Sequence, residues 1–201
     1  PGPRSDRLIA AAKRNGVYLC AGLTEKDGDR VYNSAILSAP DGRLLLKYRK
    51  INLLDVEQPF YAVGKMISVV ETPLGNIGVN ICADNYGDSP ELGHVLARMG
   101  AQVVLSPSSW TVDYSITSDN EEYRDKWLKP YQTIASLYNM VLVSVTSVGV
   151  IVGGPYQGKK MVGCSLVVGA GGMLHRGKYN EFAGALSVIE FPIPPEHEKG
   201  T

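Results

Sequence analysis

Two strand-like runs that flank one amphipathic segment constrain the fold more than any other part of the sequence. Residues 77–82 and 102–105 have the length and apolar content of strands buried in a central sheet. Between them, Ser89 can cap a helix, Pro90 suits its first position and Glu91 suits the positive end of its dipole. The apolar stripe and the glycine stop expected for this helix are Leu92, Val95, Leu96, Met99 and Gly100. A strand, a helix and a strand in succession predict an α/β fold.

The rest of the chain fits the same class. Residues 31–38 and 43–48 flank Ala39-Pro40-Asp41-Gly42, whose residue types suit a tight turn, so they predict a β-hairpin. Residues 51–64 have no clean period and predict a long loop of the kind that lines a site. The other elements expected are helices at 5–15 and 119–138, a polar loop at 106–117, and strands at 17–21, 68–71, 140–146, 163–168 and 185–191. No repeat or linker divides the chain, so we predict one domain over residues 1–201.

Charge and cysteine content exclude several classes of function. The chain has 20 Lys and Arg against 20 Asp and Glu, so nothing indicates nucleic acid or an anionic membrane as a partner. A small, weakly charged molecule fits better. Three cysteines that lie far apart argue against a disulfide scaffold and a Cys-rich zinc site, and favour a reducing, cytoplasmic setting. No apolar run approaches the roughly 18 residues of a membrane span.

Cys82 is the first candidate for chemistry. It ends a predicted strand and begins a turn that leads into the helix, so it should lie at the rim of the sheet. Backbone N–H groups at such an elbow suit an oxyanion, and a nearby positive charge would lower the pKa of the thiol. Cys20 and Cys164 lie inside apolar strand patterns, which predicts that both are structural.

Lys50 is the second candidate, because it follows a predicted strand and enters the long loop. Taken alone, a lysine at the end of a strand is usually a solvated charge. His94, His175 and His197 have no local cue for a Cys–His protease or a metal site, so neither is favoured. The glycines at 75–78, 153–154 and 169–172 do not form a phosphate-binding loop, which leaves a generic nucleotide-binding domain as a weaker alternative.

Four segments, taken in order, resemble the nitrilase or carbon–nitrogen hydrolase superfamily. The lysine segment is Tyr48-Arg49-Lys50-Ile51-Asn52-Leu53, and the cysteine segment is Gly78-Val79-Asn80-Ile81-Cys82-Ala83-Asp84. Residues 100–107 and 163–168 match as well, and the resemblance runs from about Arg7 to Phe191. It implies an α-β-β-α sandwich, incomplete at the N-terminus, in a protein that forms a homodimer or a higher homo-oligomer.

The same resemblance implies a hydrolase that cleaves amide, carbamoyl or nitrile carbon–nitrogen bonds through a cysteine thioester. Cys82 would be the nucleophile, and Lys50 would stabilise the oxyanion together with the backbone N–H of Ala83. Glu57 occupies the place of a glutamate that orients the lysine. No metal or cofactor is implied. The residues that the family pattern places against the substrate are Tyr86, Ser109 and Trp110, although Trp110 could equally belong to the core or to a dimer interface.

One member of the family's catalytic set has no match. The family carries a glutamate after an early apolar strand, whereas the acids before Lys50 are Asp6, Glu25, Asp27, Asp29 and Asp41, and none follows such a strand. Glu25 to Asp29 instead resemble the tip of a hairpin. Either the parent protein holds this glutamate upstream of Pro1, which the start without Met favours, or the general base is absent. The second case predicts a catalytically silent subunit or binding module.

Overall fold

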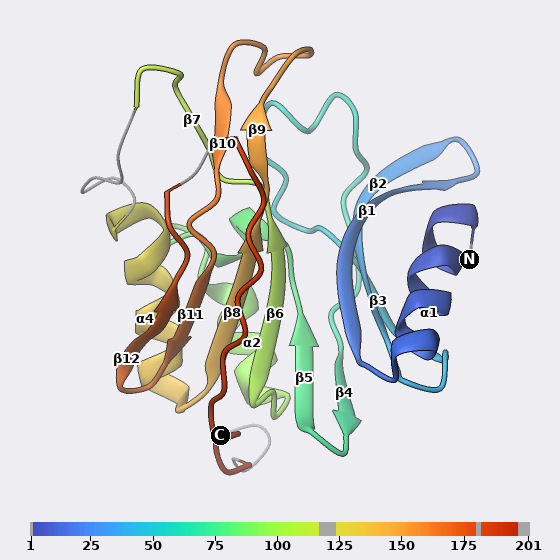
Figure 1. The fold of residues 1–201 in the computed structure, drawn as a ribbon, viewed down its shortest axis with the longest axis vertical. Helices are drawn as coiled ribbons and strands as arrows, with labels where there is room; N and C mark the ends of the chain where they lie inside the picture. Colours follow the sequence, from blue (N-terminus) through green and yellow to red (C-terminus); the bar gives the residue numbers. More distant parts are fainter. Residues whose placement is uncertain (1, 117–123, 180–181, 197–201) are drawn as a thin grey trace.

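A computed structural model describes residues 2–116, 124–179 and 182–196. The chain begins with helix α1 (Pro3–Asn15), which ends at Gly16 because that residue adopts a left-handed φ of 62°. A three-stranded antiparallel sheet follows, in the order β1 (Leu19–Asp27), β2 (Arg30–Ser38) and β3 (Leu44–Arg49). The β2–β3 pair confirms the predicted hairpin. Helix α1 packs on the outer face of this sheet (Figure 1).

A second sheet has six strands in the order β12-β11-β8-β6-β5-β4. Its central pairs β5–β6 and β6–β8 are parallel, and the flanking pairs are antiparallel. The strands are β4 (Val69–Thr72), β5 (Gly75–Val79), β6 (Val103–Ser108), β8 (Val141–Thr146), β11 (Leu166–Gly169) and β12 (Gly172–Arg176). A small third sheet comprises β7 (Thr111–Val112), β10 (Lys160–Val162) and β9 (Val148–Val150).

Helices cover the outer side of the six-stranded sheet. They are the 3-10 turn η1 (Cys82–Asn85), α2 (Glu91–Arg98), the π-helical turn η2 (Arg124–Leu128) and α4 (Lys129–Tyr138). With α1 on the opposite side, the layers are helix, sheet, sheet and helix (Figure 1), which confirms the predicted α-β-β-α sandwich. The helix predicted at 119–138 is confirmed from Arg124 onward, and its predicted start lies outside the described residues.

The main core lies between these layers. Alternate residues of β5 face opposite ways: Ile77 and Val79 are buried in the core, while Gly78 approaches Leu96 of α2 so closely that an added Cβ would lie 2.9 Å from its Cδ2. From the other sheet, Leu37 and Tyr48 join the same cluster. Burial on both faces explains why the strands β5, β6 and β8 read as continuous apolar runs.

Several sequence expectations were wrong in detail. The loop predicted at 106–117 contains the end of β6 and all of β7. The hairpin tip expected at Glu25 to Asp29 is present as the β1–β2 turn at Gly28 and Asp29, but β1 extends to Asp27, so Glu25 itself is a strand residue. Val95 and Met99 of α2 are partly exposed, because the buried side of this short helix is formed by Gly93, Leu96 and Ala97. Ser89 does not cap α2; its hydroxyl donates to the Ala83 carbonyl.

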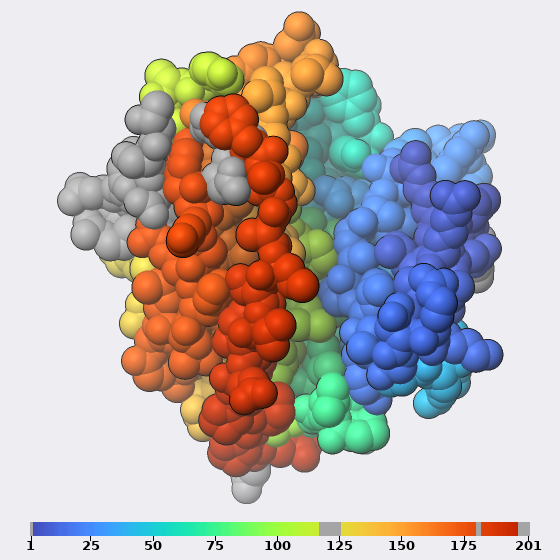
Figure 2. All heavy atoms as spheres, viewed as in Figure 1, coloured from blue at the N-terminus to red at the C-terminus, as the bar shows by residue number. Residues whose placement is uncertain are grey.

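The strand predicted at 185–191 is also wrong. Residues 182–196 run extended across the inner face of the six-stranded sheet, where Ile189 and Phe191 pack on Val103, Val141 and Val167. Alternating apolar residues account for that packing, but no described strand lies beside the segment to pair with its backbone. Figure 2 shows the segment in red on the surface, with a hollow between it and the blue β1–β2 hairpin.

Candidate active site

Cys82 lies at a backbone elbow between β5 and α2. It is the first residue of η1 and is 7% exposed. Its φ of 47° is in the left-handed region, which a non-glycine residue seldom adopts. Its N–H donates to Ser106 Oγ at 3.2 Å, and Asn85 Nδ2 donates to the same hydroxyl at 3.0 Å. The predicted elbow is confirmed, and this buried polar network holds it.

Lys50 follows β3 directly and is fixed by its own backbone. Its N–H donates to the Asn33 carbonyl and its carbonyl accepts from the Gly64 N–H, each at 2.8 Å. An added Cβ on Gly64 would lie 1.9 Å from the Arg49 carbonyl oxygen, so only glycine allows this approach. The Lys50 side chain is 2% exposed, so this lysine is a buried cation and not a solvated one.

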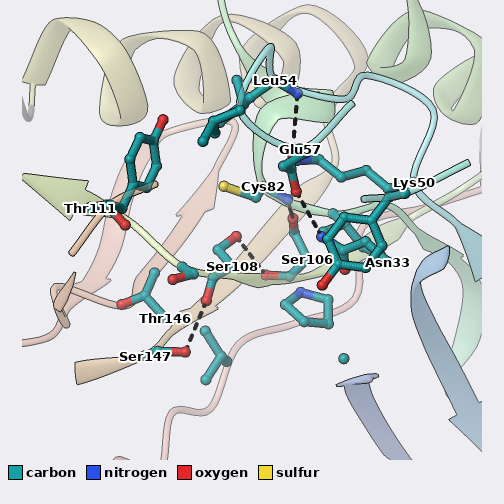
Figure 3. A pocket seen from close by; sticks show the side chains of 18 of the residues that line it. Asn33, Lys50, Leu54, Glu57, Cys82, Ser106, Ser108, Thr111, Thr146 and Ser147 are labelled. Carbon is teal, nitrogen blue, oxygen red and sulfur yellow. Dashed lines mark hydrogen bonds and ion pairs between the residues drawn. The ribbon is translucent and has the colours of Figure 1, made fainter. Parts of the chain in front are cut away.

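Glu57 provides the counter-charge of Lys50 from the long loop. Its Oε2 accepts from Lys50 Nζ and from the Leu54 N–H, and its Oε1 accepts from Asn33 Nδ2 at 3.0 Å. The carboxylate therefore receives donors from β2, from the end of β3 and from its own loop. This contact fixes where the ammonium of Lys50 points (Figure 3).

The electrostatics of Cys82 combine opposing influences. Burial raises the pKa of its thiol above the ordinary value, and the backbone N–H of Ser109 and the ammonium of Lys50 oppose that rise. Glu57 raises the same pKa, whereas the hydroxyl of Tyr86 lowers it. The resting thiol is therefore protonated near neutral pH, and its attack on a carbon requires a proton acceptor.

The sulfur faces a cavity of about 880 Å³. Figure 3 shows Lys50, Glu57 and Cys82 on one side of it, with Ser108 and Thr146 on another. Among the described residues that line it, Lys50 and Glu57 are the only charged side chains. Much of the remaining wall is apolar, and that part comprises Leu54, Val56, Phe60, Val143, Val145 and Ile151.

The other residues predicted from the sequence occupy different places. Ser109 lines the cavity, and Tyr86 lies on two adjoining cavities while its hydroxyl approaches Cys82. Ala83 follows Cys82 in η1 and is 2% exposed. Trp110 does not line the cavity; it is 1% exposed and stacks on Trp127 with ring centroids 4.8 Å apart. Its place in the core disagrees with the predicted contact to the substrate.

Sequence reasoning missed several polar residues of the site. Asn33 of β2 and the hydroxyls of Ser106, Ser108, Thr146 and Ser147 all line the cavity. The hydroxyls lie in or just after β6 and β8, whose parallel pairing brings their C-terminal ends together. Serines at successive even positions of an apolar strand were the available signal.

The described part of the chain gathers neither a set of metal ligands nor a histidine at the cavity. No three His, Cys, Asp or Glu side chains gather there as ligands for a metal ion. His94 contacts the Tyr138 hydroxyl at 2.7 Å, neither His94 nor His175 lines the cavity, and His197 lies outside the described residues.

In residues 2–116, 124–179 and 182–196, no helix has the length and apolar content that crossing a bilayer requires.

Comparison with known proteins agrees with this geometry. Residues 1–174 match the family model described as carbon-nitrogen hydrolase. The chain is 34% identical over 122 residues to Omega-amidase NIT2 of Danio rerio, a match that covers 56% of this chain and 43% of that protein. It is 37% identical over 115 residues to a nitrilase of Pyrococcus abyssi, covering 57% and 43%. The chain therefore matches less than half of the length of these two relatives.

Solved structures share the fold. A carbon-nitrogen hydrolase from Helicobacter pylori G27 superposes with a TM-score of 0.79 at 25% identity, covering 89% of this chain and 64% of that one. A mutant amidase from Nesterenkonia sp. AN1, described with acrylamide added at its active-site cysteine, gives a TM-score of 0.71 at 24% identity and covers 88% and 65%. With the family model spanning most of its length, this chain belongs to the carbon–nitrogen hydrolase family.

Proposed function

We propose that this chain hydrolyses the carbon–nitrogen bond of a small amide, carbamoyl compound or nitrile through a thioester on Cys82. One observation carries the proposal. A buried ammonium, oriented by Glu57, lies beside a buried thiol at a left-handed elbow that opens on a cavity. Preorganised positive charge beside a nucleophile is what acyl transfer requires, because negative charge develops on the substrate oxygen or nitrogen as the sulfur attacks.

The residues suggest the following sequence of steps for an amide. Cys82 loses its proton and its sulfur bonds to the carbonyl carbon, while Lys50 and the N–H of Ala83 stabilise the oxyanion. The carbon–nitrogen bond then breaks, the nitrogen takes up the proton that Cys82 released to the solvent, and it leaves as ammonia or an amine. Water attacks the thioester and releases the carboxylic acid and the thiol. The Ser109 N–H, which lowers the pKa of the Cys82 thiol, is a further donor for this site.

The walls of the cavity favour an uncharged substrate. The described lining carries one cation, and that cation is already paired with Glu57. A substrate carboxylate placed against Val143, Val145 or Ile151 would lose its hydration without gaining a counter-ion. A short aliphatic amide fits this lining better than an acidic one, although the names of the relatives include omega-amidase.

A second candidate function is a catalytically silent, ligand-binding subunit. Glu57 is the only carboxylate among the described residues that line the cavity, and its oxygens are occupied by Lys50, Leu54 and Asn33. Glu25 precedes Lys50 in the chain, as Asp27, Asp29 and Asp41 do. Its carboxylate accepts from Ser34, Lys47 and Arg49, and it does not line the cavity. A resting thiol without a base would bind ligands but turn over slowly.

Ammonia release separates the two candidates. The full-length protein is incubated with butyramide, butyronitrile, a carbamoyl compound and succinamate, and Cys82→Ala serves as the control. Hydrolysis is supported by release that Cys82→Ala abolishes, with butyramide preferred to succinamate. Absence of release from every compound, or release that survives Cys82→Ala, would defeat it. Selective alkylation of Cys82 over Cys20 and Cys164 then distinguishes a reactive thiol from an inert one.

Three broader expectations belong to the same proposal. We propose that residues 1–201 form one domain, that the protein associates as a homodimer or higher homo-oligomer, and that it works in the cytoplasm. Partly exposed apolar residues of α2 and α4, such as Val95 and Leu137, favour association. Three cysteines without a disulfide favour a reducing compartment. Light scattering coupled to size exclusion tests the oligomer, and fractionation of cells tests the location.

A further inference from the structure

Asp84 is a buried carboxylate that does not line the cavity of Cys82. It belongs to η1 and is 0% exposed. Its Oδ1 accepts from the Asn52 N–H at 2.8 Å, and its Oδ2 accepts from the Tyr48 hydroxyl at 2.7 Å and the Ile81 N–H at 2.9 Å. Removing a carboxylate from water is costly, so three donors on one buried group indicate a specific role.

The three donors come from the two segments that carry the proposed chemistry. Tyr48 is two residues before Lys50 and Asn52 is two residues after it, so the carboxylate holds the chain on both sides of the lysine. Ile81 directly precedes Cys82, so the same carboxylate also holds the entry to the elbow. Burial raises the pKa of Asp84, and the donors and the nearby Lys50 lower it.

We propose that Asp84 is a positioning residue that fixes the ammonium of Lys50 relative to the thiol of Cys82. The proposal rests on the proposed function of those two residues. The loop after β3 and the elbow after β5 are tied to each other because they share a single acceptor group. An error of about 1 Å in such an arrangement costs about 10²-fold in rate.

The substitution Asp84→Asn tests this idea with almost no change of shape. An amide offers one acceptor oxygen and one donor nitrogen. If the nitrogen replaces Oδ1 it faces the Asn52 N–H, and if it replaces Oδ2 it faces the Ile81 N–H. Either orientation sets two donors against each other, so a hydrogen bond that ties one of the two segments to residue 84 is lost. Asp88→Asn is the matched control, because Asp88 is an exposed acid four residues along the chain.

A double-mutant cycle supplies the readout that a merely structural role would not move. The rate of Cys82 alkylation by iodoacetamide, and of its acylation by an amide, is measured with Lys50 intact and in a Lys50→Met background. We expect Asp84→Asn to slow the reaction about 10²-fold with Lys50 intact. In the Lys50→Met background the same change should matter less than about threefold. A direct electrostatic effect of the Asp84 carboxylate on the Cys82 thiol would slow or speed the reaction equally in both backgrounds. It therefore cancels when the two rate factors are compared.

Each outcome decides one of the two claims. Equal factors in the two backgrounds would overturn the positioning role and leave Asp84 a stabilising residue only. If no amide acylates even the wild-type protein, the proposed function fails, while the alkylation arm still reports whether Asp84 acts through Lys50. If Asp84→Asn does not fold, Tyr48→Phe removes one donor and keeps both N–H bonds. It should give the same inequality with a smaller factor, and equal factors would again overturn the proposal.

Discussion

Replacing Glu57 by Gln removes the negative charge that faces Lys50 while preserving the size of the side chain. The ammonium is 2% exposed, so water cannot replace the lost partner. The Glu57 side chain is itself only 17% exposed, which limits solvent screening of the pair. Breaking a buried ion pair costs about 3–5 kcal/mol when one partner is removed. Because the amide oxygen can still accept from Lys50, we expect the lower end, about 3 kcal/mol.

Glu57→Gln should also slow the reaction of Cys82. Once Lys50 is no longer oriented, the developing oxyanion loses its main cation, and the rate of Cys82 acylation should fall by about 10²-fold. Urea unfolding measures the free energy of unfolding. The rate of acylation is measured by quenching the reaction at set times and determining the intact mass of the protein. Asn33 can turn its amide to meet the new NH₂ group, so that contact should survive.

Glu25→Gln is the matched control for this prediction. The Glu25 carboxylate also accepts from three side chains, Ser34, Lys47 and Arg49, but it lies in β1 and outside the cavity. Its cationic partners Lys47 and Arg49 are 45% and 23% exposed, whereas Lys50 is 2% exposed, so Glu25→Gln should cost less stability than Glu57→Gln and leave acylation unchanged. An acylation rate of Glu57→Gln within about threefold of the wild type would refute the role of Glu57 in orienting Lys50. An equal slowing by Glu25→Gln would refute it as well.

Three further predictions follow from single contacts. Gly64→Ala places a Cβ 1.9 Å from the Arg49 carbonyl oxygen, so it should destabilise the fold by about 1–3 kcal/mol in urea unfolding, whereas Gly153→Ala, with open space around it, should not. The hydrogen bond from Arg49, with help from Lys47 and Ser34, lowers the pKa of Glu25 from 4.5 to about 2, so this carboxylate stabilises the folded state above about pH 4.5 and loses that effect as the pH falls toward 2. The stability gap between wild type and Glu25→Gln should therefore shrink on acidification, and a gap that widens would be inconsistent with it. Burial raises the pKa of all three cysteines, to about 12 for Cys20 and about 11 for Cys164, but only at Cys82 do the Ser109 N–H and the ammonium of Lys50 oppose that rise, so iodoacetamide should modify Cys82 first, and peptide mapping that finds Cys20 first would contradict this.

The sequence predicts the parts of the fold that local patterns determine. The hairpin at 31–48 has both alternating strands and a turn of the right residue types, and the elbow at Cys82 follows from a strand and a helix start close together. The strand expected at 185–191 shows the limit of such patterns. Alternation reports which residues can be buried, but a strand also needs a neighbour for its backbone, and neighbours are set by tertiary structure.

The candidate site divides in the same way. Cys82, Lys50 and Glu57 belong to segments whose order along the chain resembles the family, so the sequence could indicate them. In the structure all three line one cavity. Asn33 is brought to Lys50 by the pairing of β2 with β3, and the hydroxyls of Ser108 and Thr146 are brought together by the pairing of β6 with β8. No local sequence pattern connects these residues. Trp110 illustrates a different limit, because its sequence context allowed two locations. A large aromatic residue after a strand suits a pocket or a core equally, and its stacking on Trp127 decides for the core.

The central claim is that Cys82 forms a thioester with its substrate. Intact-mass analysis of the full-length protein, quenched in acid during turnover of butyramide, measures this directly. We expect a mass increase equal to a butyryl group less the thiol hydrogen that it replaces, located at Cys82 by peptide mapping and absent from Cys82→Ala. Lys50→Met should show much less of it. Ammonia release without any adduct, and unchanged in Cys82→Ala, would contradict the account.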